Sequence, residues 1–267
     1  HYITFPLKRK KKLSTYWKIV RELRKENGEL GVIFVNTFIS ALLFRLGNVK
    51  KNIGYNREGR GFLLDFSPEI NYHKHYINRY AFLFNEYIGN KYVYLPELSL
   101  RHTGQKTFQF DNSHKTIALY LGGENKEFRK YPDEYAVQLL RLLNRQGYNL
   151  LLIGDENDNI KHTQYAEEAR IDHLINLTAR TTIEGFINTI ANVDLIITID
   201  SSALHIAAAV KTPFIALMGL STSPTSTILP KVPLGRILKI ENNLIREEDY
   251  IRNITPDLIL KTISELI

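Results

Sequence analysis

The most chemically informative stretch of the chain is a junction that begins at Asp200. An apolar run from Asp194 to Ile199 ends there, and Ser201 and Ser202 follow before a segment of mostly small residues. The apolar run predicts a strand, and the small residues predict a slim helix that lies close to the sheet. The first turn of such a helix presents backbone N–H groups and the positive end of the helix dipole. This junction therefore predicts a phosphate site.

The same junction has a plainer interpretation, because serine is a favoured residue at the start of any helix. Ser201 or Ser202 would then cap a structural helix and bind no ligand. Two other positions leave a similar choice open. Arg129 could pair with a diphosphate, or it could be one more surface cation among 35 lysines and arginines. Asp158 could accept hydrogen bonds from ribose hydroxyls, or it could cap its own helix.

These residues follow strands of one predicted parallel sheet. Apolar runs that predict strands cover residues 116–121, 149–153, 175–177, 194–199 and 213–217. Helical patterns between them cover residues 132–147, 182–191 and 201–210. A further polar helix is predicted after the acidic residues 155–158 and ends at about residue 170. Continuous apolar strands joined by crossover helices are typical of a doubly wound α/β domain with a parallel sheet. Ligands bind beyond the carboxyl ends of such strands, where the polar loops converge.

The first half of the chain is less regular. It predicts a strand over residues 31–36, a short apolar helix over residues 40–46 and an aromatic helix over residues 69–88. Residues 94–113 contain Pro96 and Gly104 and show little periodicity, so the domain boundary is expected there. The predicted division is residues 1–108, residues 109–250 and a final helix within residues 251–267.

Composition excludes several classes of protein. The 267 residues are 44% hydrophobic and 24% charged, which is ordinary for a globular protein. No apolar stretch approaches the roughly 18 residues that span a bilayer, and no signal-peptide pattern is present. The absence of cysteine excludes disulfides, thiolate metal sites and a cysteine nucleophile. These features fit a cytoplasmic protein.

The charge of the chain predicts an anionic partner. The formal net charge is +7, and residues 8–12 are five consecutive lysines and arginines. Such a run is commonly solvated surface, but near an anionic membrane each charge contributes on the order of 1 kcal/mol. Nucleic acid is not an expected partner, because the basic and aromatic stretch at residues 53–62 lacks an RNA-binding signature.

Other catalytic and metal motifs are missing from the sequence. There is no Gly-x-Gly-x-x-Gly, no Walker-type Gly-Lys-Ser/Thr and no Gly-x-Ser-x-Gly. His73, His75 and His162 lack partners at metal-ligand spacing, so we expect them to be surface residues. No metal site is predicted.

Several segments together resemble the lipopolysaccharide heptosyltransferases of glycosyltransferase family 9, and within them the group that adds the second heptose of the inner core. The most specific segment is Asp200 to Ala208 followed by the Gly219 to Pro224 loop, which is similar to the family's Asp-Ser/Thr-Gly-x-x-His-x-Ala-Ala and Gly-x-Thr-Ser-Pro pattern. The family's "NLAGKT", "PGA…KRWP", "KSAL" and "GW.GE.R..LLND" segments resemble residues 176–181, 122–132, 40–42 and 54–65.

The resemblance implies a GT-B-like fold of two Rossmann-like domains with parallel sheets, and a role for each matching residue. Residues 1–108 would be the acceptor-side domain, and residues 109–250 the nucleotide-sugar donor domain. Contacts to the donor phosphates and sugar are implied for Arg129, Asp200, Ser201, Ser202 and His205. Contacts to the nucleoside are implied for Asp158 and Thr181. The matching loops imply further donor contacts for Glu124, Asn125, Lys130 and Thr222.

The activity implied is transfer of heptose, or a similar sugar, from an ADP-sugar to a lipid A-core oligosaccharide acceptor, with inversion and without a metal or other cofactor. The implied location is cytoplasmic and peripheral on the anionic inner face of the inner membrane. Two departures qualify this expectation. Ser202 stands where the family has glycine, and the family's first strand and Gly-Asp turn have no counterpart, so the N-terminal domain is expected to be incomplete and the catalytic base is unassigned. The alternative is a relative that binds nucleotide or glycan without turnover.

Overall fold

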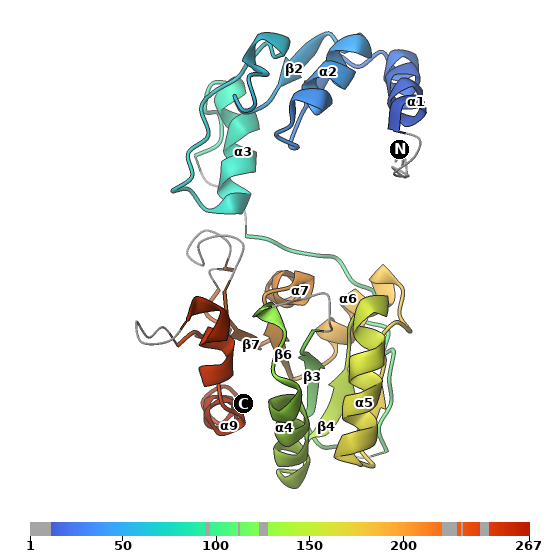
Figure 1. The fold of residues 1–267 in the computed structure, drawn as a ribbon, viewed down its shortest axis with the longest axis vertical. Coiled ribbons are helices and arrows are strands. Elements are labelled where there is room, and N and C mark those ends of the chain that lie inside the picture. The colour runs from blue at the N-terminus through green and yellow to red at the C-terminus, as the bar shows by residue number, and fades with distance from the viewer. Residues whose placement is uncertain are drawn as a thin grey trace. The chain divides into compact units, whose positions relative to one another are not determined.

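The computed structural model describes residues 12–93, 97–111, 113–122, 128–220, 229–230, 232–240 and 246–267. These residues form two compact units, with residues 12–93 in the first and the described residues from Glu97 onward in the second (Figure 1). The segment that begins at Glu97 packs on the second unit, where the N–H of Leu100 donates to the carbonyl of Ala209 at 3.1 Å.

The second unit is built on a sheet of parallel strands. The strands are β3 (Thr116–Tyr120), β4 (Asn149–Leu152), β5 (Leu174–Asn176), β6 (Leu195–Ile199), β7 (Phe214–Leu217) and β8 (Gly235–Leu238). Their order is β5-β4-β3-β6-β7-β8, and each neighbouring pair is parallel. All residues of β3, β4, β6 and β7 are buried, which explains why these strands are continuously apolar in the sequence. The predicted α/β parallel sheet is confirmed.

Helices cover both faces of this sheet. They are α4 (Asp133–Arg145), α5 (Asn159–Ala169), α6 (Ile183–Ala191), α7 (Ser202–Val210) and α9 (Pro256–Ile263). Helix α4 packs against α5 and α9, and α6 packs against α7 (Figure 1). Right-handed crossovers place helices on opposite faces when the chain reverses direction along a sheet, as it does after β5.

The reversal creates a topological switch point between β3 and β6. These two strands pair directly, with Leu119 opposite Ile197 and Tyr120 opposite Thr198. The chain leaves β3 toward α4 and leaves β6 toward α7, so the two loops diverge. Such divergence opens a crevice at the carboxyl edge of the sheet, which is the usual ligand position in this architecture.

Three helices of the second unit, α6, α7 and α9, have side-chain caps at their starts. Thr182 accepts a hydrogen bond from the N–H of Gly185 at 3.1 Å, and Ser201 accepts one from the N–H of Ala203 at 3.2 Å. Thr255 caps α9 in the same way through the N–H of Leu258. Threonine and serine stabilise helix starts in this role.

The first unit contains a small parallel sheet. Its elements are α1 (Lys12–Glu26), β1 (Leu30–Val32), α2 (Phe38–Leu46), β2 (Lys51–Ile53), a 3-10 helix at Gly61–Leu63 and α3 (Tyr76–Tyr87). Strands β1 and β2 pair in parallel. Helix α3 begins seven residues later than the predicted start at Glu69, and α1 and β2 were not predicted. In the ranges that the structure describes, no helix is long and apolar enough to cross a membrane.

Candidate functional site

A pocket of about 350 Å³ lies at the carboxyl edge of the second sheet. Its walls come from the ends of β3 and β4, the turn after β5, the first residues of α6 and the start of α7. The lining residues are Tyr120, Gly154, Asp155, Thr181, Thr182, Ile183, Phe186, Ser202 and Ile206. Of the residues predicted for a donor site, Thr181 and Ser202 belong to this wall.

The side chains that the sequence did not single out make the pocket a largely apolar slot. The rings of Tyr120 and Phe186 meet edge to face, with centroids 6.4 Å apart. Ile183 and Ile206 add aliphatic surface, and the Ile183 side chain is 82% exposed. A slot of this kind with polar groups at its rim suits a planar heterocycle such as a nucleobase.

The start of α7 forms the polar end of the pocket. Ser201 is the N-cap in an extended conformation, and its hydroxyl also lies 3.0 Å from the Thr198 hydroxyl. Ala203, Ala207 and Ala208 are buried against the sheet, so small residues do bring this helix close to it. The capping interpretation of Ser201 is therefore confirmed. It leaves the anion interpretation open, because the cap hydroxyl satisfies one first-turn N–H and a ligand could be bound by others.

Two of the acidic residues after β4, Asp155 and Asp158, have different surroundings. Asp155 is exposed and lines the pocket, whereas Asp158 is fully buried. Asp158 accepts a hydrogen bond from the N–H of Asp155 at 3.0 Å, and Asp155 accepts one from the N–H of Asn157 at 2.8 Å. This reciprocal arrangement is a capping box. Asp158 is the third helical residue of this box, whose N-cap is Asp155, and at the start of α5 its side chain makes no capping hydrogen bond, so the expectation that it caps its own helix is wrong. The carboxylate at the pocket wall is that of Asp155.

Gly154 is required where β4 ends. A Cβ atom at this position would lie 2.8 Å from a carboxylate oxygen of Asp158 and 3.2 Å from the Thr178 methyl group. The buried Asp158 side chain therefore fills the space behind the pocket floor, and the backbone of Gly154 forms part of the pocket surface.

The pKa of Tyr120, a residue of the pocket wall, responds to three charged side chains nearby. Burial raises the pKa of the Tyr120 phenol, and the negative charges of Asp158 and Asp155 raise it further. The positive charge of Arg129 acts in the opposite direction. Arg129 is therefore close enough to act electrostatically on a residue of the pocket wall, and Tyr120 stays a neutral phenol at physiological pH.

The expectation that His162 is a surface residue is wrong. Its side chain is fully buried, and its Nδ1 lies 2.7 Å from the Thr178 hydroxyl. Burial lowers the pKa of His162 to about 4, despite the opposing effect of Asp158 and Asp155. The spacing of His162, Tyr165 and Ala169, which all face inward from α5, was the sequence signal for this burial.

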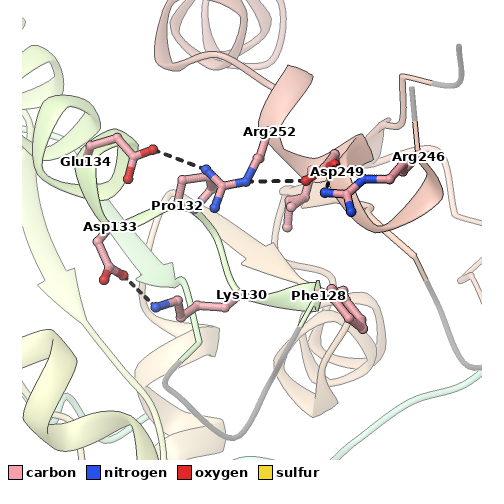
Figure 2. A pocket seen from close by; sticks show the side chains of 9 residues that line it. Phe128, Lys130, Pro132, Asp133, Glu134, Arg246, Asp249 and Arg252 are labelled. Carbon is pink, nitrogen blue, oxygen red and sulfur yellow. Dashed lines mark hydrogen bonds and ion pairs between the residues drawn. The ribbon is translucent and has the colours of Figure 1, made fainter. Parts of the chain in front are cut away.

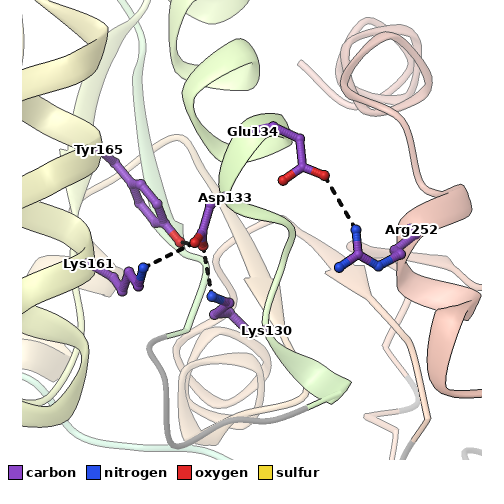
Figure 3. Close-up of polar contacts among 6 residues, drawn as sticks. All are labelled: Lys130, Asp133, Glu134, Lys161, Tyr165 and Arg252. Atoms are coloured by element: carbon purple, nitrogen blue, oxygen red, sulfur yellow. Dashed lines mark hydrogen bonds and ion pairs between the residues drawn. The ribbon is translucent and has the colours of Figure 1, made fainter.

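Lys130 points away from the pocket and toward an ion-pair cluster. Its Nζ lies 2.8 Å from Asp133 Oδ1, and Asp133 also accepts hydrogen bonds from Lys161 at 3.1 Å and from the Tyr165 hydroxyl (Figure 3). Burial alone would raise the pKa of Asp133, but the bonds from Lys130, Tyr165 and Lys161 lower it to about 2. Lys130 thus fixes the start of α4.

A second cavity, of about 400 Å³, lies on the other side of Lys130. The lining includes two ion-paired arginines: Arg252 contacts Glu134 at 3.3 Å, and Arg246 contacts Asp249 at 2.8 Å (Figure 2). Because the cations that line it pair with carboxylates of the same cavity, this cavity is electrostatically balanced and lacks the excess charge expected of a phosphate site.

The remaining predicted residues flank the pocket or lie outside the described ranges. Asp200 occupies the bend between β6 and α7, and His205 lies one turn into α7; both are half-buried. Glu124, Asn125, Thr222 and residues 8–11 fall outside the part of the chain that the structure describes. Within that part, no group of three or more His, Asp or Glu side chains is arranged to hold a metal ion.

In the first unit, one buried arginine joins two segments that resembled the family pattern. Arg60 is fully buried, and its guanidinium donates to the carbonyl of Tyr55 at 2.9 Å, to the Asn36 side chain at 2.9 Å and to the Ser40 hydroxyl at 3.1 Å. It also bonds the carbonyl of Val35. Because Arg60 holds the start of α2 against the loop after β2, the two segments form one structural motif.

Comparisons with known proteins agree with this architecture. The family model described as glycosyltransferase family 9 (heptosyltransferase) matches residues 16–248. Lipooligosaccharide heptosyltransferase 2 of Haemophilus influenzae is 26% identical over 281 residues, covering 96% of this chain and 81% of that protein. E. coli ADP-heptose lipopolysaccharide heptosyltransferase II has a TM-score of 0.79 at 22% identity, covering 95% of this chain and 81% of that one. E. coli heptosyltransferase WaaC, solved with ADP, has a TM-score of 0.73 at 15% identity, with coverage of 98% and 83%.

Proposed function

The chain belongs to glycosyltransferase family 9, the heptosyltransferases, and from this premise we propose that it transfers heptose, or a similar sugar, from an ADP-sugar to a lipopolysaccharide inner-core acceptor. The observation that carries the proposal is the pocket of about 350 Å³, which combines an apolar slot with the start of α7 at the switch point of a parallel sheet. A nucleoside and a diphosphate need these two environments side by side.

The pocket residues suggest how the donor binds. The adenine ring occupies the slot between Phe186 and the isoleucines, with Thr181 at its edge. Asp155 accepts hydrogen bonds from the ribose hydroxyls, since it is the carboxylate exposed at the wall. The diphosphate lies at the start of α7 beside Ser202, where Arg129 supplies a compensating positive charge. Asp200 and His205 extend this arrangement toward the sugar.

The relatives support the choice of donor and acceptor. The E. coli heptosyltransferase WaaC was solved with ADP, and heptosyltransferase II of E. coli is described by its ADP-heptose substrate. The Haemophilus relative is named for lipooligosaccharide. We extend these properties to this chain because the matched region includes the whole pocket, from Tyr120 to Ile206.

The proposed reaction is a single displacement with inversion. The acceptor hydroxyl attacks the anomeric carbon, the bond from that carbon to the β-phosphate oxygen breaks, and ADP leaves with both bonding electrons. A base takes the hydroxyl proton. The charge on ADP is stabilised by Arg129 and the α7 N-terminus, so the proposed step uses no metal ion. The proposed location is the cytoplasm, where ADP-sugars are available.

Calorimetric titration with ADP tests the proposal, with Arg129→Ala as the affected variant and Lys130→Ala as its matched control. Loss of a charge-assisted contact should weaken ADP binding roughly ten- to hundred-fold in Arg129→Ala. Lys130→Ala should bind nearly as well as the parent, because Lys130 pairs with Asp133 outside the pocket. No ADP binding by the parent protein, or equal effects of the two variants, would contradict the donor site.

Turnover is measured separately by mass spectrometry of a heptose-deficient lipopolysaccharide core incubated with ADP-heptose. A mass increase of one heptose, with release of ADP, supports the transferase. ADP binding without any such product supports the alternative of a relative that binds nucleotide without turnover.

A further inference from the structure

A buried histidine supports the turn that follows β5. His162 belongs to α5 and is fully buried, and its Nδ1 lies 2.7 Å from the Thr178 hydroxyl. Its other ring nitrogen, Nε2, has no hydrogen-bond partner among the described residues. A buried polar atom without a partner destabilises a protein, and an aliphatic side chain at this position would avoid that penalty. The hydrogen bond to Thr178 is the polar contact that histidine adds here.

Thr178 begins the turn that forms one wall of the pocket. It is fully buried, its N–H donates to the Asn176 side chain at 3.0 Å, and its methyl group would lie 3.2 Å from a Cβ atom at Gly154. The next residue, Ala179, donates its N–H to the carbonyl of Gly154 at 3.1 Å. Gly154 and Thr181 both line the pocket. A shift of Thr178 would therefore move two parts of the pocket surface.

His162 reaches Thr178 from a helix that is itself held firmly in place. Lys161 and Tyr165 of the same helix both bond the Asp133 carboxylate at the start of α4. The Tyr165 ring also lies beside His162, with centroids 5.9 Å apart. Burial lowers the pKa of His162 to about 4, so the ring is neutral at physiological pH and its bond to Thr178 joins two neutral groups. Helix α5 thus provides a fixed support for the turn.

We propose that His162 is a positioning residue of the nucleoside site, because its hydrogen bond to Thr178 holds the turn that carries Thr181. The inference rests on the proposed function, since it requires that the nucleoside of the donor occupies the pocket. The fully buried His162 acts on the ligand only through Thr178 and its neighbours. Loss of the bond weakens nucleoside binding and leaves the phosphate end at α7 unchanged.

Thr178→Val and Thr178→Ser form a matched pair that separates the hydrogen bond from packing. Valine keeps the branched shape of threonine and removes the hydroxyl, whereas serine keeps the hydroxyl and removes the methyl group. Thr178→Val should weaken adenosine binding roughly five- to ten-fold, because the bond to His162 is lost. Thr178→Ser should change adenosine affinity by less than about two-fold. Titration calorimetry measures both, and circular dichroism checks that both variants fold.

A comparison of ADP with adenosine shows whether the effect is confined to the nucleoside end. ADP affinity should fall by the same factor as adenosine affinity in Thr178→Val, so the ratio of the two affinities stays constant. A general loosening of the second unit would also weaken the phosphate contribution and lower the ratio. In the transfer reaction, KM for the ADP-sugar should rise by that factor while kcat stays within about two-fold.

Substitutions at His162 provide a second, independent pair. His162→Asn places an amide near the position of Nδ1 and should largely retain adenosine affinity. His162→Leu fills the space without a polar atom and should weaken adenosine binding as much as Thr178→Val does. The double variant His162→Leu/Thr178→Val should bind adenosine no more weakly than either single variant, because both substitutions remove the same hydrogen bond.

Hydrogen exchange without any ligand measures the turn directly. Thr178→Val should accelerate exchange in a peptide that covers residues 177–182, where Ala179 bonds Gly154, and should leave the α7 peptide unchanged. Unchanged exchange in the turn overturns the inference. So does a Thr178→Ser variant that binds adenosine as weakly as Thr178→Val, since packing would then be the cause.

The same measurements separate this inference from the proposed function. A parent protein that binds neither adenosine nor ADP overturns the donor site and this inference together. A parent protein that binds adenosine, with Thr178→Val and His162→Leu binding it equally well, overturns this inference alone.

Discussion

The backbone N–H of Asp155 donates to the buried carboxylate of Asp158 at 3.0 Å, and this hydrogen bond links two acidic residues with different roles. The buried side chain of Asp158 stabilises the turn after β4, and the exposed Asp155 lines the pocket. The family resemblance implies the ribose contact for Asp158, whereas the exposed position in this structure is that of Asp155. The choice between them can be tested with two isosteric substitutions.

Asp155→Asn should weaken adenosine binding roughly ten-fold, because an amide is a poorer acceptor for ribose hydroxyls than a carboxylate. Asp158→Asn should change adenosine affinity by less than about two-fold, because the amide oxygen can still accept the N–H of Asp155. Titration calorimetry with adenosine measures both. The opposite ranking would return the ribose contact to Asp158.

Ser202→Gly should strengthen ADP binding several-fold and leave adenosine binding unchanged. Ser202 lines the pocket at the start of α7, and removal of its side chain lets a phosphate approach the backbone N–H groups more closely. The comparison of ADP with adenosine isolates the phosphate contribution. Equal changes for both ligands would show that Ser202 acts on the nucleoside slot instead.

The free energy of unfolding should fall as the pH falls from about 6.5 to about 4, because of His162. The pKa of this histidine is lowered from 6.5 to about 4 by burial, so the unfolded chain binds a proton in this range and the native protein does not. Stability therefore rises with pH across the window, by roughly 2–3 kcal/mol for this group. Urea denaturation at a series of pH values measures it.

The control for this prediction is another histidine. His162→Gln should flatten the pH dependence between about 4 and 6.5, whereas His173→Gln should not, since His173 is exposed. Asp133 contributes in a separate window, because its pKa is lowered from 3.8 to about 2 and its stabilisation is lost only below about pH 4. An unchanged slope in His162→Gln would contradict the assignment.

Ala179→Gly should stabilise the protein by about 0.5–1 kcal/mol. Ala179 has a φ of 60° in the turn that carries Thr181, and this left-handed conformation costs an L-residue roughly 1–2 kcal/mol. The loss of chain entropy at a new glycine offsets part of the gain. The same change at Ala166, inside α5, should instead destabilise by about 1 kcal/mol. Thermal unfolding of both variants measures the opposite signs.

The sequence predicted the second unit well because four of its strands, β3, β4, β6 and β7, are fully buried and so are almost continuously apolar. The five predicted runs correspond to β3 through β7. Strand β8 was missed because it has four residues and its two central residues, Arg236 and Ile237, are both exposed, so it has neither a continuous apolar run nor an alternating pattern. Helix α1 was missed because cations interrupt its exposed side, although Tyr16, Ile19, Val20 and Leu23 follow helical spacing.

The sequence predicted the polar residues of the candidate site that lie in turns, and it did not predict the apolar residues that line the pocket. Ser201, Ser202 and Thr181 stand out as polar residues at strand ends, and they do gather at the sheet edge. Phe186 and Ile206 look like core residues of their helices, and only tertiary packing shows that they face a pocket. The role of Asp158 had a local signal, because Asp155 and Asp158 stand at the spacing of a capping box.

Six of the nine residues that line the pocket come from one continuous stretch, from Gly154 to Phe186. In the proposed donor site, the residues that would contact the base therefore belong mainly to one segment of the chain, from the end of β4 to α6, and α7 would supply the phosphate end. Such a segment can be exchanged as one piece. A transplant of residues 154–186 from a relative that uses another nucleotide is the simplest route to a transferase with a reprogrammed donor.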